Sequence, residues 1–390
     1  MTPTFSRRSA WPSEENALSS AVAKRRAQGL EVLDLTASNP TTAELPYDAA
    51  SVLEPLTDSR ALIYQPDPLG IASARETVAE RYRQRGVSVD ASRVMITASS
   101  SESYAFLFAL LADPGDEILI PAPSYPLLSF LADLSVLKLV PYSLSRHDDW
   151  RPDSSIESLI SSRTKAIVSV SPNNPTGSYL DQDDLARLVG IAERHGLAVI
   201  QDEVFSGYVF GTEEHSPSIA AFDGCLTFAL DGLSKAAALP HMKLGWIIAN
   251  GPPALVERAM ERLALIADTF LSVATPVQHA LPKLLDGSRG VVTAIRERAA
   301  RNLAKLSERF RVPNLARLWP VRAGVYATLQ VPATRSDDAW TLDALEHGVL
   351  IQPGHFYDYP PSVCTVVISL LTPESVFDIG IERLDVLFNS

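Results

Sequence analysis

The chain has 390 residues, which predicts two or three structural units rather than one small module. Apolar residues make up 46% and charged residues 21%, and a net charge of −12 without a Lys/Arg run excludes a general binder of nucleic-acid phosphates. The two cysteines, Cys225 and Cys364, lie far apart and exclude a disulfide framework or a cysteine metal site.

In chain order, residues 1–44 come first, and we expect them to form an arm that packs with the C-terminal unit. Two arginines occur near the start, but no apolar segment follows them as a signal peptide would require. No apolar run anywhere approaches the roughly 20 residues that span a bilayer. We therefore expect a cytoplasmic protein without a membrane or nucleic-acid partner.

Residues 45–280 are predicted to form one large unit. Between about 90 and 250, short apolar runs alternate with amphipathic stretches such as 183–196, which has helical spacing and ends at a glycine. This alternation predicts an α/β fold with a mostly parallel, seven-stranded sheet between helices. The seven predicted strands are 93–97, 117–121, 137–142, 165–170, 197–201, 226–230 and 244–249.

Residues 281–390 have a different pattern and predict a smaller α+β unit. A long helical pattern at 291–310 leads to two candidate strands at 324–331 and 364–371. A final helix is predicted over 374–388.

Four polar segments follow predicted strands, where ligands bind in open α/β sheets. They are "ASSSES" at 98–103, "SPNNPTG" at 171–177, Gln201 with the acids Asp202 and Glu203, and Asp231 with Lys235. Each alone is also compatible with a helix cap, a turn or a surface lysine. Together, at one sheet edge, they supply phosphate donors, an amide, a carboxylate and an amine.

This set of groups suits pyridoxal phosphate. A lysine amine forms a Schiff base with the cofactor aldehyde, and a carboxylate keeps the pyridine nitrogen protonated. Hydroxyls and backbone N–H groups at the start of a helix receive the phosphate.

The motifs "YQPDPLG", "PAPSYP", "SPNNPTG", "DEVF" and "LSK" occur in one order along nearly the whole chain. With these motifs in this order, the sequence resembles the fold-type I, class I/II aminotransferases (the aspartate aminotransferase superfamily). The resemblance implies a homodimer with shared active sites that binds pyridoxal phosphate. It also implies a ping-pong transfer of an amino group from a small-molecule donor, an amino acid or amine, to a keto acid.

The resemblance assigns the reactive end of the cofactor to four residues. Lys235 would form the Schiff base and then move the proton between substrate and cofactor. Asp202 would pair with the pyridine nitrogen, and Asn174 would donate to the phenolic oxygen and lie near the substrate. Tyr125 would stack on the ring.

The phosphate would be held, by the same resemblance, by Ser100 and Ser101 with help from Ser234. Tyr64 would reach the phosphate of the neighbouring subunit. Many relatives carry an arginine eight residues after the Schiff-base lysine, and here that position is Lys243, a point charge without the bidentate fork.

Two departures from the family affect the rest of the site. Phe205 stands where many relatives have a tyrosine that donates to the phenolic oxygen, and Tyr208 is a candidate substitute. The carboxylate-binding arginine expected near 364–371 is absent, because the alignment places Val367 there. Ser38 and Arg322 are the predicted substrate-binding residues, and His355 is a further candidate.

Three functions stay open at this point. The first is the aminotransferase, for which the missing arginine leaves open an amine or a modified amino acid as the donor. The second is a pyridoxal-phosphate lyase that eliminates a β- or γ-substituent on the same scaffold. The third is a non-catalytic binding protein, against which the presence of Lys235, Asp202 and Asn174 argues. No metal is predicted.

Overall fold

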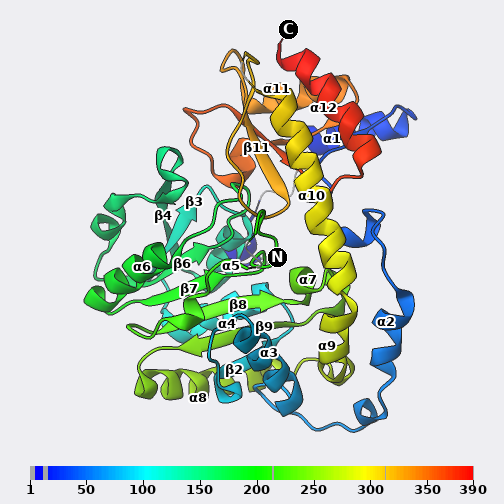
Figure 1. Cartoon of the computed structure of the whole chain (residues 1–390). Coiled ribbons are helices and arrows are strands. Elements are labelled where there is room, and N and C mark those ends of the chain that lie inside the picture. The colour runs from blue at the N-terminus through cyan, green and yellow to red at the C-terminus, as the bar shows by residue number, and fades with distance from the viewer. Residues whose placement is uncertain (1–4, 12–15, 213–214, 312, 390) are drawn as a thin grey trace, which may run out of the picture.

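The computed structural model describes all residues except 1–4, 12–15, 213–214, 312 and 390 (Figure 1). Its largest sheet has eight strands in the order β2-β9-β8-β7-β6-β3-β4-β5. The seven predicted strands are confirmed, and the count is corrected to eight because the two-residue edge strand β5 is too short to give a pattern. The strands are β2 Val94–Thr97, β3 Glu117–Ala122, β4 Lys138–Ser145, β5 Arg151–Pro152, β6 Thr164–Val170, β7 Ala198–Asp202, β8 Thr227–Gly232 and β9 Gly245–Asn250.

The sheet is mostly parallel, as predicted. Strands β8, β7, β6, β3 and β4 run parallel to one another, whereas β9 is antiparallel to β8 and β2, and β5 is antiparallel to β4. Nearly every residue of β2, β3, β6, β7 and β8 is buried, so these strands read as continuous apolar runs rather than as alternating ones.

Helices cover both faces of this sheet. Neighbouring strand residues belong to different cores: Met95 packs in one cluster and Ile96 in the other, because successive side chains point to opposite faces. One core includes α3 Ala72–Gln84, α6 Gln182–His195 and α9 Thr275–Gly287; the other includes α4 Ser100–Leu111, α5 Leu127–Ser135 and α8 Pro253–Phe270.

The C-terminal part forms a smaller α+β unit around a four-stranded antiparallel sheet in the order β10-β11-β14-β13. The predicted strands and helices are confirmed with small shifts at their ends. The elements are β10 Arg317–Leu318, β11 Tyr326–Gln330, β13 Gln352–Pro353, β14 Thr365–Ser369, α10 Arg289–Arg309, α11 Asp337–Glu346 and α12 Glu374–Phe388.

The N-terminal segment lies against this smaller unit. β1 Leu33–Asp34 pairs in parallel with β12 Val349–Leu350, and α1 Ala17–Ala27 packs beside α11. Figure 1 shows α10 running from α9, beside the large sheet, up to the small sheet. The division of the chain after residues 44 and 280 stays a prediction.

The remaining helices are short. They are α2 Ala49–Leu53, α7 Leu233–Ala236, η1 Arg7–Ser9, η2 Pro40–Thr42, η3 Glu54–Thr57, η4 Ser59–Leu62, η5 Ala91–Arg93, η6 Arg146–Asp148, η7 Ser154–Leu159, η8 Ile219–Ala221, η9 Pro240–Met242 and η10 Gly354–Tyr357. Among the described residues, no helix has both the length and the apolar character needed to cross a membrane.

Candidate active site

Three neighbouring parallel strands, β6, β7 and β8, end at the same edge of the large sheet. Val170 at the end of β6 lies opposite Asp202, and Asp202 lies opposite Leu230 of β8. The segment 171–177 follows β6, and Lys235 lies in α7 directly after β8. The strand ends therefore bring together the amide-bearing segment, the carboxylate and the amine, where an open α/β sheet binds its ligand.

Two tyrosines fix the backbone that carries Lys235. The Tyr208 hydroxyl donates to the carbonyl oxygen of Lys235 at 2.6 Å, and the Tyr47 hydroxyl donates to that of Ala238 at 2.6 Å. The amine itself lies 5.7 Å from the centre of the Phe205 ring. Because the Tyr208 hydroxyl is engaged in this way, it does not replace the donor that is lost at Phe205.

The amine and the carboxylate influence each other across the site. Burial lowers the pKa of Lys235, and the nearby Asp202 partly opposes this. Burial also raises the pKa of Asp202 to about 6, although its carboxylate accepts the backbone N–H of Val204 at 3.1 Å and the hydroxyl of Tyr104 at 3.3 Å. The amine is therefore neutral more often than that of a surface lysine, and the carboxylate is poised to pair with a cation.

Asn174 lies in a loop that its neighbour ties down. The Asn173 side chain accepts from the Thr176 backbone at 3.2 Å and donates to the carbonyl oxygen of Pro123 at 3.3 Å. Asn174 is buried, and its Oδ1 has no hydrogen-bond partner among the described residues. A buried amide oxygen without a partner indicates a place for a polar group from outside the chain.

The start of α4 offers a place for an anion. The Ser99 hydroxyl accepts the N–H of Glu102 at 3.2 Å, and the Glu102 carboxylate accepts the N–H of Ala98 at 2.6 Å, so the first turn is fixed on both sides. Within the described chain, the half-buried hydroxyls of Ser100 and Ser101 make no hydrogen bond of their own. Free donors at a helix N-terminus suit a phosphate.

Three of the predicted phosphate residues are placed less tightly. Ser234 lies in α7, next to Lys235, and is partly buried. Lys243 is exposed, follows η9 in a left-handed conformation with φ 52°, and forms no ion pair with a described residue. Tyr64 lies in an exposed segment on the surface. Their contacts with a cofactor stay predictions.

The substrate side of the site is lined by tyrosines. The pKa of Tyr326 is raised to about 12, mainly by burial, with Tyr125 adding to the shift and a hydrogen bond from Ser38 opposing it. Tyr125 and Tyr326 likewise act on the pKa of Tyr357, which is raised by burial. The backbone of residue 357 also accepts the N–H of Ser124 at 2.9 Å. The predicted residues Ser38 and Tyr125 are thus brought together beside Tyr326.

Val367 lies in a wall without charge. It is opposite Thr328 of β11 and Gln352 of β13, so the three side chains share one face of the small sheet with Tyr326. Val367 is 1% exposed. Four aromatic residues pack around it: Trp150, Trp319, Tyr357 and Tyr359. We call these five residues the aromatic wall.

Hydrogen bonds between neutral side chains join the aromatic wall to Gln352 and Thr328. The Tyr357 hydroxyl donates to the Gln352 carboxamide at 2.5 Å, and the Tyr359 and Thr328 hydroxyls lie 2.8 Å apart. Where the family resemblance expects a guanidinium, this chain therefore has a packed neutral surface.

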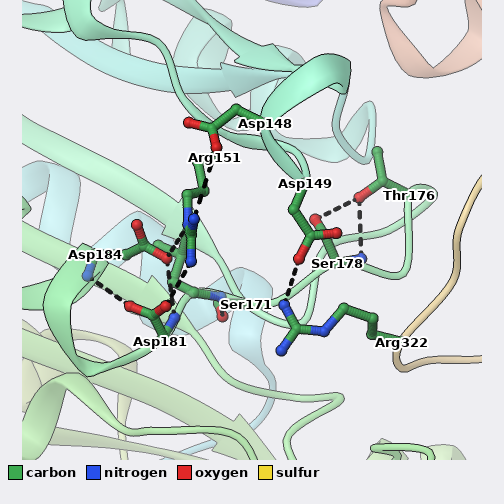
Figure 2. Close-up of polar contacts among 10 residues, drawn as sticks. Asp148, Asp149, Arg151, Ser171, Thr176, Ser178, Asp181, Asp184 and Arg322 are labelled. Carbon is green, nitrogen blue, oxygen red and sulfur yellow. Dashed lines mark hydrogen bonds and ion pairs between the residues drawn. The ribbon is translucent and has the colours of Figure 1, made fainter.

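The two cations considered as replacements are already paired. Arg322 forms an ion pair with Asp149 at 2.5 Å (Figure 2) and stacks on the ring of Tyr179 at 4.0 Å. His355 lies 3.1 Å from Asp337 in the exposed part of η10. The structure therefore does not bring Arg322 or His355 to the substrate side as free cations.

The comparisons with known proteins agree with this geometry. Residues 31–377 match the family "Aminotransferase class I and II". The chain belongs to this family. It is 30% identical over 351 residues to the glutamate-pyruvate aminotransferase AlaA of Escherichia coli K12, covering 85% of this chain and 84% of that protein. It is 33% identical over 278 residues to an alanine aminotransferase of Mycobacterium bovis, covering 69% and 63%.

Solved structures show the same fold. An aminotransferase from Escherichia coli superposes with a TM-score of 0.87 at 25% identity, over 100% of this chain and 98% of that one. An alanine aminotransferase from Pyrococcus furiosus superposes with a TM-score of 0.87 at 25% identity, over 99% of each chain. The family implies pyridoxal phosphate as the cofactor, and the chain is an aminotransferase of fold type I.

Three tyrosines of the site were not predicted. Tyr104 and Tyr47 contact Asp202 and Ala238 over long stretches of sequence, and Tyr104 is indistinguishable from a core residue within its apolar helix. Tyr326, in "GVYATLQV", had a signal: its strand was predicted, and a tyrosine that is buried needs a polar partner.

Proposed function

We propose that this aminotransferase attaches pyridoxal phosphate to Lys235 and transfers an amino group from an amino acid or amine to a keto acid in a ping-pong cycle. The observation that carries the proposal is the edge of the large sheet, where the ends of β6, β7 and β8 gather Asn174, Asp202 and Lys235. The start of α4 adds Ser100 and Ser101 for the phosphate.

When bound, the cofactor supplies an aldehyde that takes up the amino group and a ring that accepts electrons. Residues of the chain would hold the ring and move the proton. Asp202, once ionised, would hold a proton on the ring nitrogen, and Asn174 would donate to the ring oxygen. Lys235 would carry the proton to and from the reacting carbon, and burial helps by lowering the pKa of its amine. Tyr125, half-exposed at the mouth of the site, would cover the ring.

We further propose that the preferred donor lacks a free α-carboxylate. A carboxylate placed against the aromatic wall would lose water, and Val367 cannot donate a hydrogen bond to it. The two nearest arginines are engaged elsewhere: Arg322 is held by Asp149, and Arg146 lies over the Trp319 ring at 5.3 Å and donates to Gln330. An amine, ester or amide meets the same neutral surface at little cost. The names of the relatives make alanine, glutamate and pyruvate the natural compounds for comparison.

The test is a set of matched donors: L-alanine, L-alanine methyl ester, L-alaninamide and L-glutamate. Formation of pyridoxamine phosphate is followed by absorbance in single turnovers, and Lys235→Ala is the control that should be inactive. We expect kcat/KM to be higher for the ester and amide than for free alanine. A higher kcat/KM for free alanine would overturn the substrate proposal. No pyridoxamine phosphate from any donor, or release of ammonia instead, would overturn the transaminase proposal.

We propose a homodimer in which Tyr64 serves the neighbouring active site. Leu62, Ile63 and Tyr64 are 88%, 66% and 76% exposed in the single chain, and three consecutive exposed apolar residues are typical of a covered surface. Light scattering should give twice the chain mass of 42.3 kDa. A monomeric mass at micromolar concentration would contradict it. The cytoplasmic location stays a prediction.

A further inference from the structure

A second recess lies away from the aromatic wall, between α3, the junction of α9 and α10, and the residues Gly207, Tyr208 and His215. It has a volume of about 730 Å³. Figure 1 shows α3, α9 and the start of α10 at the lower end of the molecule, beside the edge of the large sheet. We call this recess the arginine cleft, because five arginines line it: Arg81, Arg83, Arg85, Arg289 and Arg296.

Two of these arginines are neutralised by acids of the same lining. Arg83 lies 3.2 Å from Glu80 and 3.8 Å from Glu76, and Arg289 lies 2.7 Å from Asp286. In the described part of the lining, these pairs include all three carboxylates, Glu76, Glu80 and Asp286.

Arg81 has an unpaired donor, and its charge acts on the buried carboxyl of Asp231. It forms no ion pair or hydrogen bond with any residue in the described part of the chain, and its Nε is buried. A guanidinium has five N–H donors and stays charged at any physiological pH. A buried donor of this kind is an unmet hydrogen-bonding demand that a ligand could satisfy.

Arg85 is a second arginine with an unpaired donor; its side chain is 5% exposed and lies over the ring of Tyr82 at 4.6 Å. Its Nη2 lies 3.5 Å from the buried carboxylate of Glu203 and donates to the carbonyl oxygen of Ser216 at 3.3 Å. Its Nη1 is buried and has no partner among the described residues. One side of the guanidinium is therefore held by Glu203 and Ser216, while the other side carries a buried donor that lacks a partner among the described residues.

The pKa of His215 responds to the charges that line the cleft. Its pKa is lowered to about 3, first by burial and then by Arg85, Arg81 and Arg296. The imidazole is therefore neutral, and its Nδ1 has no hydrogen-bond partner within the described residues. Three cations act together on this ring, and the buried carboxyls of Glu203 and Asp231 offset part of the positive charge at Arg85.

We propose that the arginine cleft binds a small multivalent oxyanion, a phosphate or a carboxylate compound. Arg81 and Arg85 would supply charge-assisted, fork-shaped donors, the geometry that matches phosphate and carboxylate oxygens. The neutral His215 would add a further polar contact. The proposal does not depend on the proposed function, since none of these residues holds the cofactor or the substrate.

Two residues that line the cleft are connected to Lys235. Tyr208 and Ala236 also line it. Tyr208 fixes the Lys235 carbonyl oxygen, and Ala236 follows Lys235 in the chain. An anion bound here would lie next to the residues that position the backbone of Lys235.

The test is calorimetric titration of the full chain saturated with pyridoxal phosphate, so that the phosphate site of the cofactor is filled. Inorganic pyrophosphate and citrate are the probes, at constant ionic strength. Arg81→Gln is the test variant. Lys283→Gln is the matched control, because it removes the same charge from an exposed position on α9 that does not line the cleft.

We expect saturable binding of one probe molecule per chain, weakened about tenfold or more in Arg81→Gln and unchanged within twofold in the control. The expected loss corresponds to one charge-assisted hydrogen bond of about 1.5 kcal/mol or more. Binding of pyrophosphate alone, citrate alone or both identifies the source of the oxyanion and supports the proposal. No saturable binding of either probe, or an equal loss in both variants, would overturn it.

Discussion

Asp202→Asn tests the carboxylate that we assign to the ring nitrogen of the cofactor. The raised pKa of about 6 sets the expected pH dependence. Well above pH 6 the carboxylate is already ionised and pairs with the cationic ring nitrogen without further cost. At pH 5, one unit below its pKa, ionising it costs about 1.4 kcal/mol, so cofactor affinity should fall about tenfold from its plateau for this reason alone.

Asparagine keeps the shape but removes the charge. Breaking a buried ion pair costs about 3–5 kcal/mol, so the variant should bind pyridoxal phosphate at least about a hundredfold more weakly at pH 7.5. The ratio of the dissociation constants of variant and wild type should then shrink about tenfold between pH 7.5 and pH 5, because only the wild type loses an ionised group.

The measurement is a titration of cofactor-free protein with pyridoxal phosphate from pH 5 to pH 8, followed by tyrosine and tryptophan fluorescence. The phosphate of the cofactor and Lys235 also titrate, but they do so in both proteins, so the ratio isolates Asp202. The same linkage predicts that the free energy of unfolding of cofactor-free wild type falls as pH rises from about 4 to about 6, because the folded chain holds the proton more tightly. A ratio that stays constant across pH would refute the assignment.

Three further substitutions test other contacts. Tyr208→Phe removes the hydroxyl that holds the Lys235 carbonyl oxygen; urea unfolding should show a loss of about 1–3 kcal/mol and kcat should fall with KM little changed, whereas an unchanged kcat would contradict the positioning role. Arg322→Gln should leave KM for every donor within twofold, because Asp149 already holds the guanidinium; a selective rise in KM for carboxylate donors would return Arg322 to the substrate site. Glu203→Gln leaves the buried cation of the pair uncompensated and should lower the free energy of unfolding by about 3–5 kcal/mol; a loss below about 1 kcal/mol would show that the pair is not needed.

The sequence predicted the reactive end of the site because its residues follow strands. Lys235, Asp202 and Asn174 each come directly after a predicted buried strand, and parallel strands bring such positions together. The strands themselves were readable because they are buried on both faces. Strand β5 was not, because two residues carry no pattern.

The sequence predicted only part of the neutral environment that we propose for the substrate. The absence of an arginine at Val367 is a property of the sequence, but what fills the space is not. Trp319 and Tyr359 lie 40 positions apart and Trp150 lies 169 positions before Trp319, and only the folded chain places them around Val367. The pairing of Arg322 with Asp149 is equally non-local, because the partners are 173 positions apart.

The central claim is that Lys235 carries the cofactor. The most direct measurement is borohydride reduction of the protein loaded with pyridoxal phosphate, followed by proteolysis and mass spectrometry of the lysine-containing peptides. The account predicts one phosphopyridoxyl group per chain, on Lys235, and none on Lys243. A label on another lysine, or no stable label, would contradict it.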